Sequence, residues 1–103
     1  MKELRDLIKS YLLYCEKKKR LSKHTIKAYR IDLSQFCSHK EDMSISKEDL
    51  VIYIHYLHEN YRPKTIRRKI ASLKAFIHYL YYKDVIPNNP FDKIDTSFKE
   101  PLL

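Results

Sequence analysis

The chain has 103 residues, of which 44% are hydrophobic and 33% are charged, with a formal net charge of +8. This length predicts one domain with a single modest core, and this composition predicts a globular rather than a disordered chain. The sequence contains no glycine, which favours helices, because hairpins and barrels usually need turns with positive φ. No apolar run approaches the roughly 18 residues that span a bilayer, and charges interrupt the first residues too often for a signal peptide.

Apolar residues at helical spacing predict a helix over 2–18 and a second over 23–39. The cations of 17–20 suit the C-terminus of the first helix, and Ser22 is the natural N-cap of the second. The residues predicted to face inward are Leu4, Leu7, Ile8, Tyr11, Leu12 and Cys15, followed by Ile26, Tyr29, Leu33, Phe36 and Cys37. We interpret the two cysteines as small buried apolar groups rather than as a disulfide, which fits a reducing cytoplasm.

The polar run 40–46 is predicted to be a loop. Ser46 and Asp49 resemble a capping box, which predicts a third helix over 47–60. Its residues predicted to face inward are Leu50, Val51, Ile54, Leu57 and Tyr61. The polar residues of this helix are mixed in sign, so we assign it to the scaffold.

Pro63 fits the first turn of a fourth helix, because proline there removes only an unpaired N–H. This helix is expected to end near Lys83, where prolines interrupt the chain. A short helical turn is predicted over 91–95, and residues 96–103 have the character of a linker. The inward face of the fourth helix is predicted to hold Ile66, Ile70, Leu73, Phe76, Ile77 and Leu80.

Positive charge gathers on two of these helices. The segments 17–31 and 62–83 each contain seven Lys or Arg residues, together fourteen of the twenty-one, while all thirteen acids lie outside them. On the outer side of the fourth helix, small residues sit among cations: Ala71 and Ala75 among Lys64, Arg67, Arg68, Lys74 and His78. For one segment alone, a solvated lysine-rich helix is an equal alternative. The repetition favours a polyanion-binding surface, and a cationic face with small side chains suits a DNA groove.

Three stretches in order then resemble a known family. They are a Thr-x-x-x-Tyr-x-x-Asp-Leu-x-x-Phe run at 25–36, ISKEDLVIYIHYL at 45–57, and RPKTIRRKIASLKAFIHYL at 62–80, with Asn89-Pro90 beyond. This pattern resembles the N-terminal core-binding, SAM-like domain of tyrosine recombinases, which include phage and transposon integrases and Xer-type resolvases. The resemblance covers about 4–95. It implies an all-α fold, a compact bundle of four helices packed as two crossed helical hairpins.

The resemblance also implies a role in site-specific recombination. Residues 1–95 would be the DNA-binding domain, and residues 96–103 would begin a linker to a catalytic domain that closes over the other face of the duplex. The implied DNA contacts are Lys23, His24, Thr25, Lys27 and Arg30 from the helix over 23–39, and Lys64, Thr65, Arg67, Arg68 and Lys74 from the fourth helix. Most are flexible cations, so phosphate contacts are expected to dominate. Arg30, Arg67 and Arg68 are the candidates for reading guanine.

No catalytic residue is assigned to this chain, because the family's tyrosine nucleophile and its Arg, Lys and His partners lie on the C-terminal domain. The tyrosines of 79–82 are interpreted as packing, since nothing beside them supplies a base or a phosphate clamp. His55 and His58 share a helix, but no cysteine or acid cluster completes a zinc site. Asp32 is interpreted as a helix-surface or family-pattern residue rather than an acid catalyst. We expect neither a cofactor nor a metal.

The expected partners are double-stranded DNA at a recombination core site, the protein's own C-terminal catalytic domain, and further recombinase protomers on DNA. No membrane contact is expected, and the location is the cytoplasm, with the nucleoid when bound. Two alternatives stay open: a free-standing basic helical DNA-binding protein, and a helical protein-interaction module whose lysines are merely solvated. The reading frame beyond Leu103 would distinguish a recombinase domain from the first alternative. A salt-dependent DNA titration tests the second.

Overall fold

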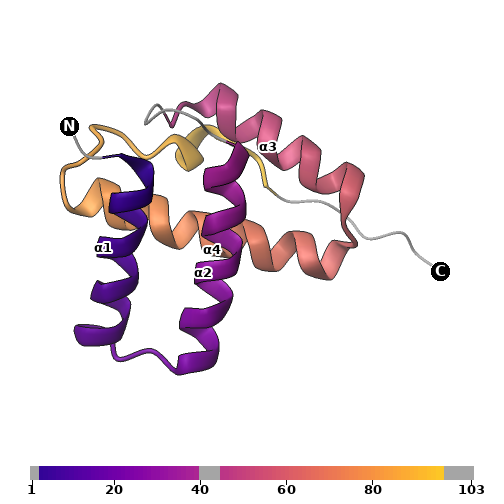
Figure 1. The fold of residues 1–103 in the computed structure, drawn as a ribbon. Helices are drawn as coiled ribbons and strands as arrows, with labels where there is room; N and C mark the ends of the chain where they lie inside the picture. Colours follow the sequence, from indigo (N-terminus) through magenta and orange to yellow (C-terminus); the bar gives the residue numbers. More distant parts are fainter. Residues whose placement is uncertain (1–2, 40–44, 97–103) are drawn as a thin grey trace.

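A computed structural model describes residues 3–39 and 45–96, and Figure 1 shows their arrangement. The described residues are all-α and contain no strand, which confirms the predicted fold class. The elements are α1 (Leu4–Lys17), α2 (Lys23–His39), α3 (Lys47–Asn60), α4 (Pro63–Tyr82) and the 3₁₀ helix η1 (Pro90–Lys93).

The helices begin where local chemistry starts them. The Ser22 hydroxyl oxygen accepts the backbone N–H of Thr25 at 3.2 Å, and that of Ser46 accepts the N–H of Asp49 at 3.1 Å. Each bond satisfies an N–H that has no partner inside the helix. Pro63 occupies the first turn of α4, as expected. The bounds of α2 and α3 confirm the prediction, whereas the expected turn over 91–95 begins slightly earlier, as η1.

The first helix begins at Leu4, after Glu3 as an extended N-cap, slightly later than the expected start near residue 2. Most of the expected loop and linker lies outside the described residues. Within the residues described, no helix combines the length and apolar character needed to cross a membrane.

The four helices form two hairpins that cross. Figure 1 shows α1 and α2 side by side and antiparallel, and α4 running across them, with α3 doubling back along α4. One hydrophobic core joins the two hairpins and η1, and its largest fully buried side chains include Phe36, Phe76 and Leu73. The amphipathic pattern of each helix produces this arrangement, because each apolar stripe must be covered by a neighbouring helix.

The predicted inward face of α3 is wrong at Val51, whose side chain is 41% exposed. Val51 follows Leu50 by about 100° around the helix, and α3 lies at the edge of the bundle, so only a narrow stripe is covered. Tyr53 is buried instead and packs edge-on against Phe36, with ring centroids 5.0 Å apart. The other predicted inward residues are buried or half-buried, and Tyr29, Cys37 and Tyr61 belong to the half-buried group.

Two turns use the left-handed backbone region without glycine. Arg20, after α1, has φ 51°, and Asp84, after α4, has φ 60°. Beside Asp84, the N–H of Val85 donates to the carbonyl of Leu80 at 2.9 Å, which closes the end of α4. A non-glycine residue in this region costs energy, so both turns must be held by their surroundings. Both cysteines are free thiols, and Cys15 is fully buried.

Candidate nucleic-acid interface

The outer face of α4 is cationic, and its inner face is apolar. Cationic or titratable side chains are exposed along it: Lys64, Arg67, Arg68, Lys74 and His78. Ala71 is exposed between them and Ala75 is half-buried, and α4 contains no acidic residue. All six residues predicted to face inward on this helix are buried. The predicted division of α4 into two faces is therefore confirmed.

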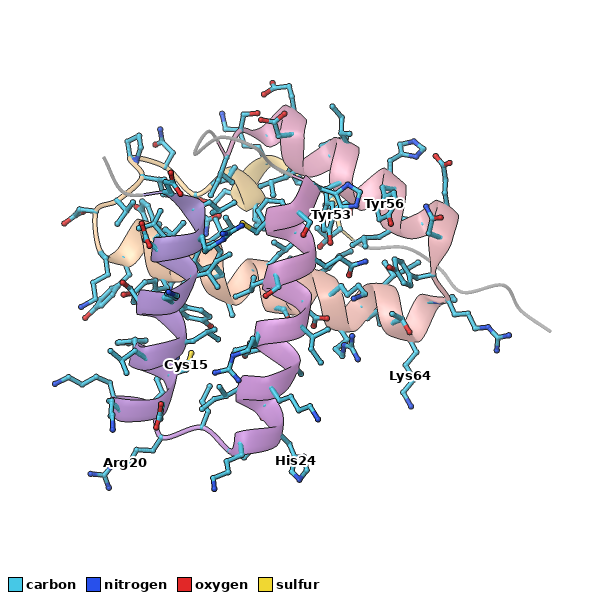
Figure 2. All side chains as sticks on the ribbon, in the orientation of Figure 1. Cys15, Arg20, His24, Tyr53, Tyr56 and Lys64 are labelled. Atoms are coloured by element: carbon cyan, nitrogen blue, oxygen red, sulfur yellow. The ribbon has the colours of Figure 1, made fainter. Side chains whose placement is uncertain are left out.

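The start of α2 also carries exposed cations. Lys23, His24 and Lys27 are exposed, while Thr25 is half-buried, as is Thr65 in the first turn of α4. In Figure 2, His24 and Lys64 both point to the lower side of the view, away from α3. The hydroxyl of Ser22 donates to that of Thr25 at 3.0 Å, so Thr25 helps to begin α2 as well as facing outward.

Arg30 lies apart from this group. It lines a hollow of about 380 Å³ between α1 and α2, to which Arg5 and Lys9 contribute but no residue of α4. Its position is close to that of Cys37 around the helix, on the side that meets α1. The exposed cations predicted for the interface therefore lie on the outer face of α4 and on the first turns of α2, whereas Arg30 lies on the side of α2 that meets α1.

A buried carboxylate joins α2 to α4 beneath this surface. The Asp32 side chain is 0% exposed, and its Oδ1 accepts from Arg68 Nη2 at 2.8 Å and from Lys69 Nζ at 3.2 Å. Its Oδ2 accepts from the Ser72 hydroxyl at 2.7 Å. A buried charge is tolerated only when it is paired and hydrogen-bonded, and three donors meet that condition here.

The network extends beyond Asp32. Lys69 also donates to the side-chain carbonyl of Gln35, whose amide donates to the Tyr61 hydroxyl. The Lys69 ammonium lies 5.1 Å from the centre of the Tyr61 ring. This chain of contacts ties α2, α4 and the turn before α4 together, so the two helices that carry the exposed cations cannot shift independently.

The structure corrects the interpretation of Asp32 as a helix-surface residue, since only 2% of it is exposed. The reason is electrostatic: Arg68 and Lys69 from α4 neutralise it inside the helix interface. Arg68 does reach the outer face, as predicted, with 52% of its side chain exposed, but Asp32 fixes its orientation. One of its five N–H donors is thus directed inward, and the others are left for the surface.

Sequence reasoning missed Lys69 and Ser72, which are both buried. Lys69 lies three residues after Ile66 and four before Leu73, so it interrupts the apolar stripe of α4. A cation inside such a stripe, with an acid similarly placed on a second helix, is the signal that could have indicated a buried ion pair.

The other groups considered for chemistry form no catalytic constellation among the residues described. Tyr79 packs against Tyr11 and Tyr14, with ring centroids about 5 Å apart, and Tyr82 is exposed. His55 lies 3.6 Å from Glu59 in an exposed pair on α3. Across 3–39 and 45–96, no three His, Cys, Asp or Glu side chains gather as metal ligands.

Comparison with known proteins gives the chain's relatives. Residues 8–84 match the family described as phage integrase, N-terminal SAM-like domain. A tyrosine recombinase of Agathobacter rectalis is 52% identical over 106 residues, covering the whole chain and 35% of that protein. The tyrosine recombinases XerC of a Roseiflexus species and XerD of Listeria innocua are 30% and 32% identical, each covering 90% of the chain and about a third of the relative.

The chain therefore spans about a third of the length of these curated relatives. No solved structure matches it significantly.

Proposed function

The chain belongs to the family of phage integrase N-terminal SAM-like domains, and on this basis we propose that it is the DNA-binding domain of a tyrosine-type site-specific recombinase. It grips duplex DNA through α2 and α4, for integration or recombination. The observation that carries this proposal is the acid-free cationic face of α4, together with the cationic start of α2, the helix that packs against it. Two helices that present cations on one surface, fixed to each other by the Asp32 network, form a rigid polyanion-binding platform.

Within this proposal the side chains have different tasks. Lys23, Lys27 and Lys64 neutralise phosphates, because flexible ammonium groups suit the DNA backbone. Ala71 lets α4 approach the major groove closely. Arg68 is the better placed of the guanine-reading candidates, because its contact with Asp32 orients the guanidinium before DNA arrives.

The same proposal covers the rest of the recombinase. Residues 1–95 act as the core-binding domain and residues 96–103 as the start of a linker. Strand cleavage is carried out by a catalytic domain of the recombinase outside this unit. The partners are duplex DNA, that catalytic domain and further recombinase protomers on the DNA, and the domain works in the cytoplasm.

The test compares two double variants in titrations with duplex DNA. Lys64→Gln with Arg67→Gln removes two cations from the outer face of α4, and Lys47→Gln with Lys93→Gln removes two from α3 and η1. The first pair is expected to weaken binding by about tenfold or more, since each direct contact contributes about 1–3 kcal/mol. The second pair is expected to change binding only through the screened net charge. Circular dichroism checks that each variant is folded.

A salt series on the unaltered chain completes the test. If about five or six cations neutralise phosphates, log K falls against log salt with a slope near −5. Equal losses from the two double variants would leave only a basic helical protein without a groove helix. A slope near zero would remove DNA binding altogether and favour the protein-interaction module.

A further inference from the structure

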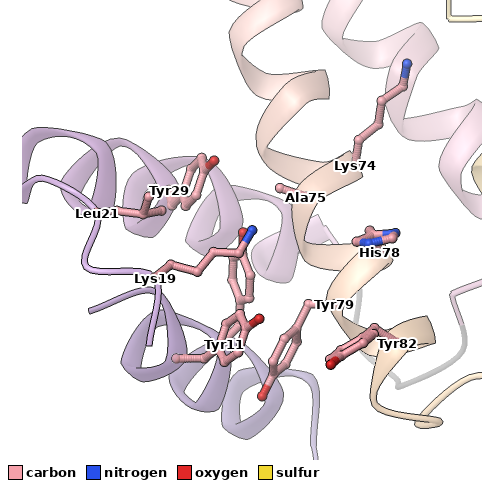
Figure 3. Close-up of a pocket in the computed structure, with 10 residues that line it drawn as sticks. Tyr11, Lys19, Leu21, Tyr29, Lys74, Ala75, His78, Tyr79 and Tyr82 are labelled. Atoms are coloured by element: carbon pink, nitrogen blue, oxygen red, sulfur yellow. The ribbon is translucent and has the colours of Figure 1, made fainter. Parts of the chain in front are cut away.

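A hollow in the protein surface lies beside the proposed DNA-binding surface. It is a hollow of about 460 Å³ between the end of α1, the start of α2 and the C-terminal half of α4, which we call the tyrosine cavity (Figure 3). This volume lies within the range of small-molecule sites. Ala75, on the small-residue face of α4, forms part of its wall, so the cavity borders the surface proposed to meet DNA.

The walls of the tyrosine cavity are largely aromatic. Five tyrosines line it, Tyr11, Tyr14, Tyr29, Tyr79 and Tyr82, together with Leu21 and Ala75. Tyr11 lies near the centre and stacks on Tyr29, with ring centroids 5.9 Å apart and planes at 26°. Flat aromatic walls of this kind favour a planar ligand, because aromatic rings prefer offset-stacked or edge-to-face contacts with other rings.

The charge around the tyrosine cavity is positive. Lys19, Lys74 and His78 line it, and no carboxylate does so. Figure 3 shows Lys19 extending toward α4, whereas Lys74 and His78 extend from the other side of that helix. The backbone N–H of Lys19 donates to the carbonyl of Tyr14 at 3.2 Å, which fixes the base of this side chain. The cavity therefore offers the Lys19 ammonium, carried on an anchored stretch of backbone, to an anionic group.

Burial favours the protonated form of two of the lining tyrosines, Tyr11 and Tyr79. Burial raises the pKa of Tyr11, and burial followed by neighbouring Tyr14 raises the pKa of Tyr79. Protonated phenols and an ammonium group are both hydrogen-bond donors, and both suit the oxygens of a phosphate.

We propose that the tyrosine cavity binds one nucleotide, with its base against the tyrosine rings and its phosphate at the Lys19 ammonium. A nucleotide joins a planar base to an anionic phosphate, which match the aromatic walls and the Lys19 ammonium. Stacking of a base on aromatic rings tolerates any base sequence. Because the cavity borders the α4 surface, an unpaired nucleotide of bound DNA is one source, and this part of the inference rests on the proposed function. A free mononucleotide is the other source.

The first arm of the experiment uses thymidine 5′-phosphate, titrated into the ¹⁵N-labelled chain and followed by NMR. The amide signals of Lys19, Leu21 and Ala75 are expected to shift and saturate. Inorganic phosphate and thymidine alone are expected to bind at least about tenfold more weakly, because each supplies one of the two contacts. The absence of a saturable shift would overturn the inference.

Two matched pairs of variants locate the site. Lys19→Gln is expected to weaken the mononucleotide about tenfold, whereas Lys18→Gln, one residue away and outside the cavity lining, leaves it within about twofold. Tyr82→Leu is expected to weaken it at least about fivefold. Tyr81→Leu alters an exposed neighbour that does not line the cavity, and should have no effect. Equal losses within either pair would contradict a site at this cavity.

The second arm compares a paired duplex with the same duplex carrying one unpaired nucleotide. A preference for the unpaired nucleotide that disappears in Lys19→Gln, with affinity for the paired duplex retained, identifies the strand as the source. Lack of that preference, while the mononucleotide still binds, overturns the strand as the source and leaves the free nucleotide as ligand. Failure of the unaltered chain to bind either duplex would overturn the proposed function without affecting the mononucleotide result.

Discussion

Asp32 is an acidic residue that is buried as deeply as a core leucine, and its neighbours explain how a carboxylate can lie there. Lys69 is only 5% exposed, so the two opposite charges lie together in a region that water does not reach. Removing charges from water is expensive, and mutual attraction offsets that cost only when the remaining hydrogen bonds are also made. Ser72 and Gln35 make those bonds here. The pair is thus better understood as fixing the register of α2 on α4 than as a source of net stability.

Asp32→Asn should therefore destabilise the fold by about 3–5 kcal/mol, because it leaves the Lys69 ammonium buried without a counter-charge. The measurement is urea denaturation followed by circular dichroism. Asp92→Asn, an exposed acid on η1, is the matched control and should change stability by less than about 0.5 kcal/mol. The ion-pair assignment is wrong if Asp32→Asn costs no more than this control.

The two thiols should differ in reactivity. Cys15 is 0% exposed and burial raises its pKa, whereas Cys37 is half-buried. Because the thiolate is the reactive form, a disulfide reagent should modify Cys37 in the native chain and reach Cys15 only on unfolding. Counting modified thiols by mass spectrometry, with and without denaturant, checks this. The Cys15→Ser variant keeps only Cys37, and the Cys37→Ser variant keeps only Cys15. Equally rapid modification of these two variants in the native state would contradict the burial of Cys15.

At the scale of whole elements, the sequence predicted most of this structure. Hydrophobic periodicity and caps located α2 and α3 at their observed bounds, and the apolar stripe of α4 was predicted completely. Periodicity failed at Val51 because it shows which face is apolar, but not how much of that face a neighbouring helix covers. Periodicity places Asp32 and Lys69 within the apolar stripes of their helices, but it cannot show that two residues 37 positions apart in the sequence meet.

The same reason limits what could be predicted of the candidate site. Exposure of the cations on α4 follows from its periodicity, but the side of α2 that faces α4 depends on how the hairpins cross. Arg30 was therefore grouped with Lys27 from the sequence, although the structure places it in the hollow beside α1.

Leu73→Ala tests the inner face of α4. Leu73 is 1% exposed at the middle of the helix, so truncation should destabilise the fold by about 2–5 kcal/mol through lost burial and the cavity left behind. Leu13→Ala is the matched control, since Leu13 on α1 is 56% exposed and its loss should cost less than about 0.5 kcal/mol. Urea midpoints of the two variants give the comparison, and similar values would mean that α4 is packed differently.

At the scale of the whole molecule, buried and half-buried tyrosines are expected to limit stability at alkaline pH. Burial raises the pKa of Tyr11, Tyr53 and Tyr79, while a tyrosine in the unfolded chain ionises near pH 10. The folded state thus holds its phenolic protons more tightly. Their stabilising contribution is fully present below about pH 10 and is lost as the pH rises further.

We expect urea midpoints to stay constant from neutral pH to about pH 9 and to fall above about pH 10. Tyr53→Phe keeps the ring against Phe36 but removes one titrating hydroxyl, so its decline should be shallower. Tyrosinate absorbance, recorded alongside, shows whether the buried phenols ionise together with unfolding. Stability that increases above pH 10 would contradict the raised pKa values of these tyrosines.

The two left-handed turns at Arg20 and Asp84 have a consequence for the denatured chain. Glycine loses the most conformational freedom on folding, and this sequence folds without any. Because every residue carries a side chain, the unfolded backbone samples fewer conformations than a glycine-containing chain would. Less conformational entropy is therefore lost when the helices form. Among the residues that the structure describes, the compensating cost falls on Arg20 and Asp84, which both lie outside the helices. At these two turns, backbone strain in the folded chain accompanies a less flexible unfolded chain.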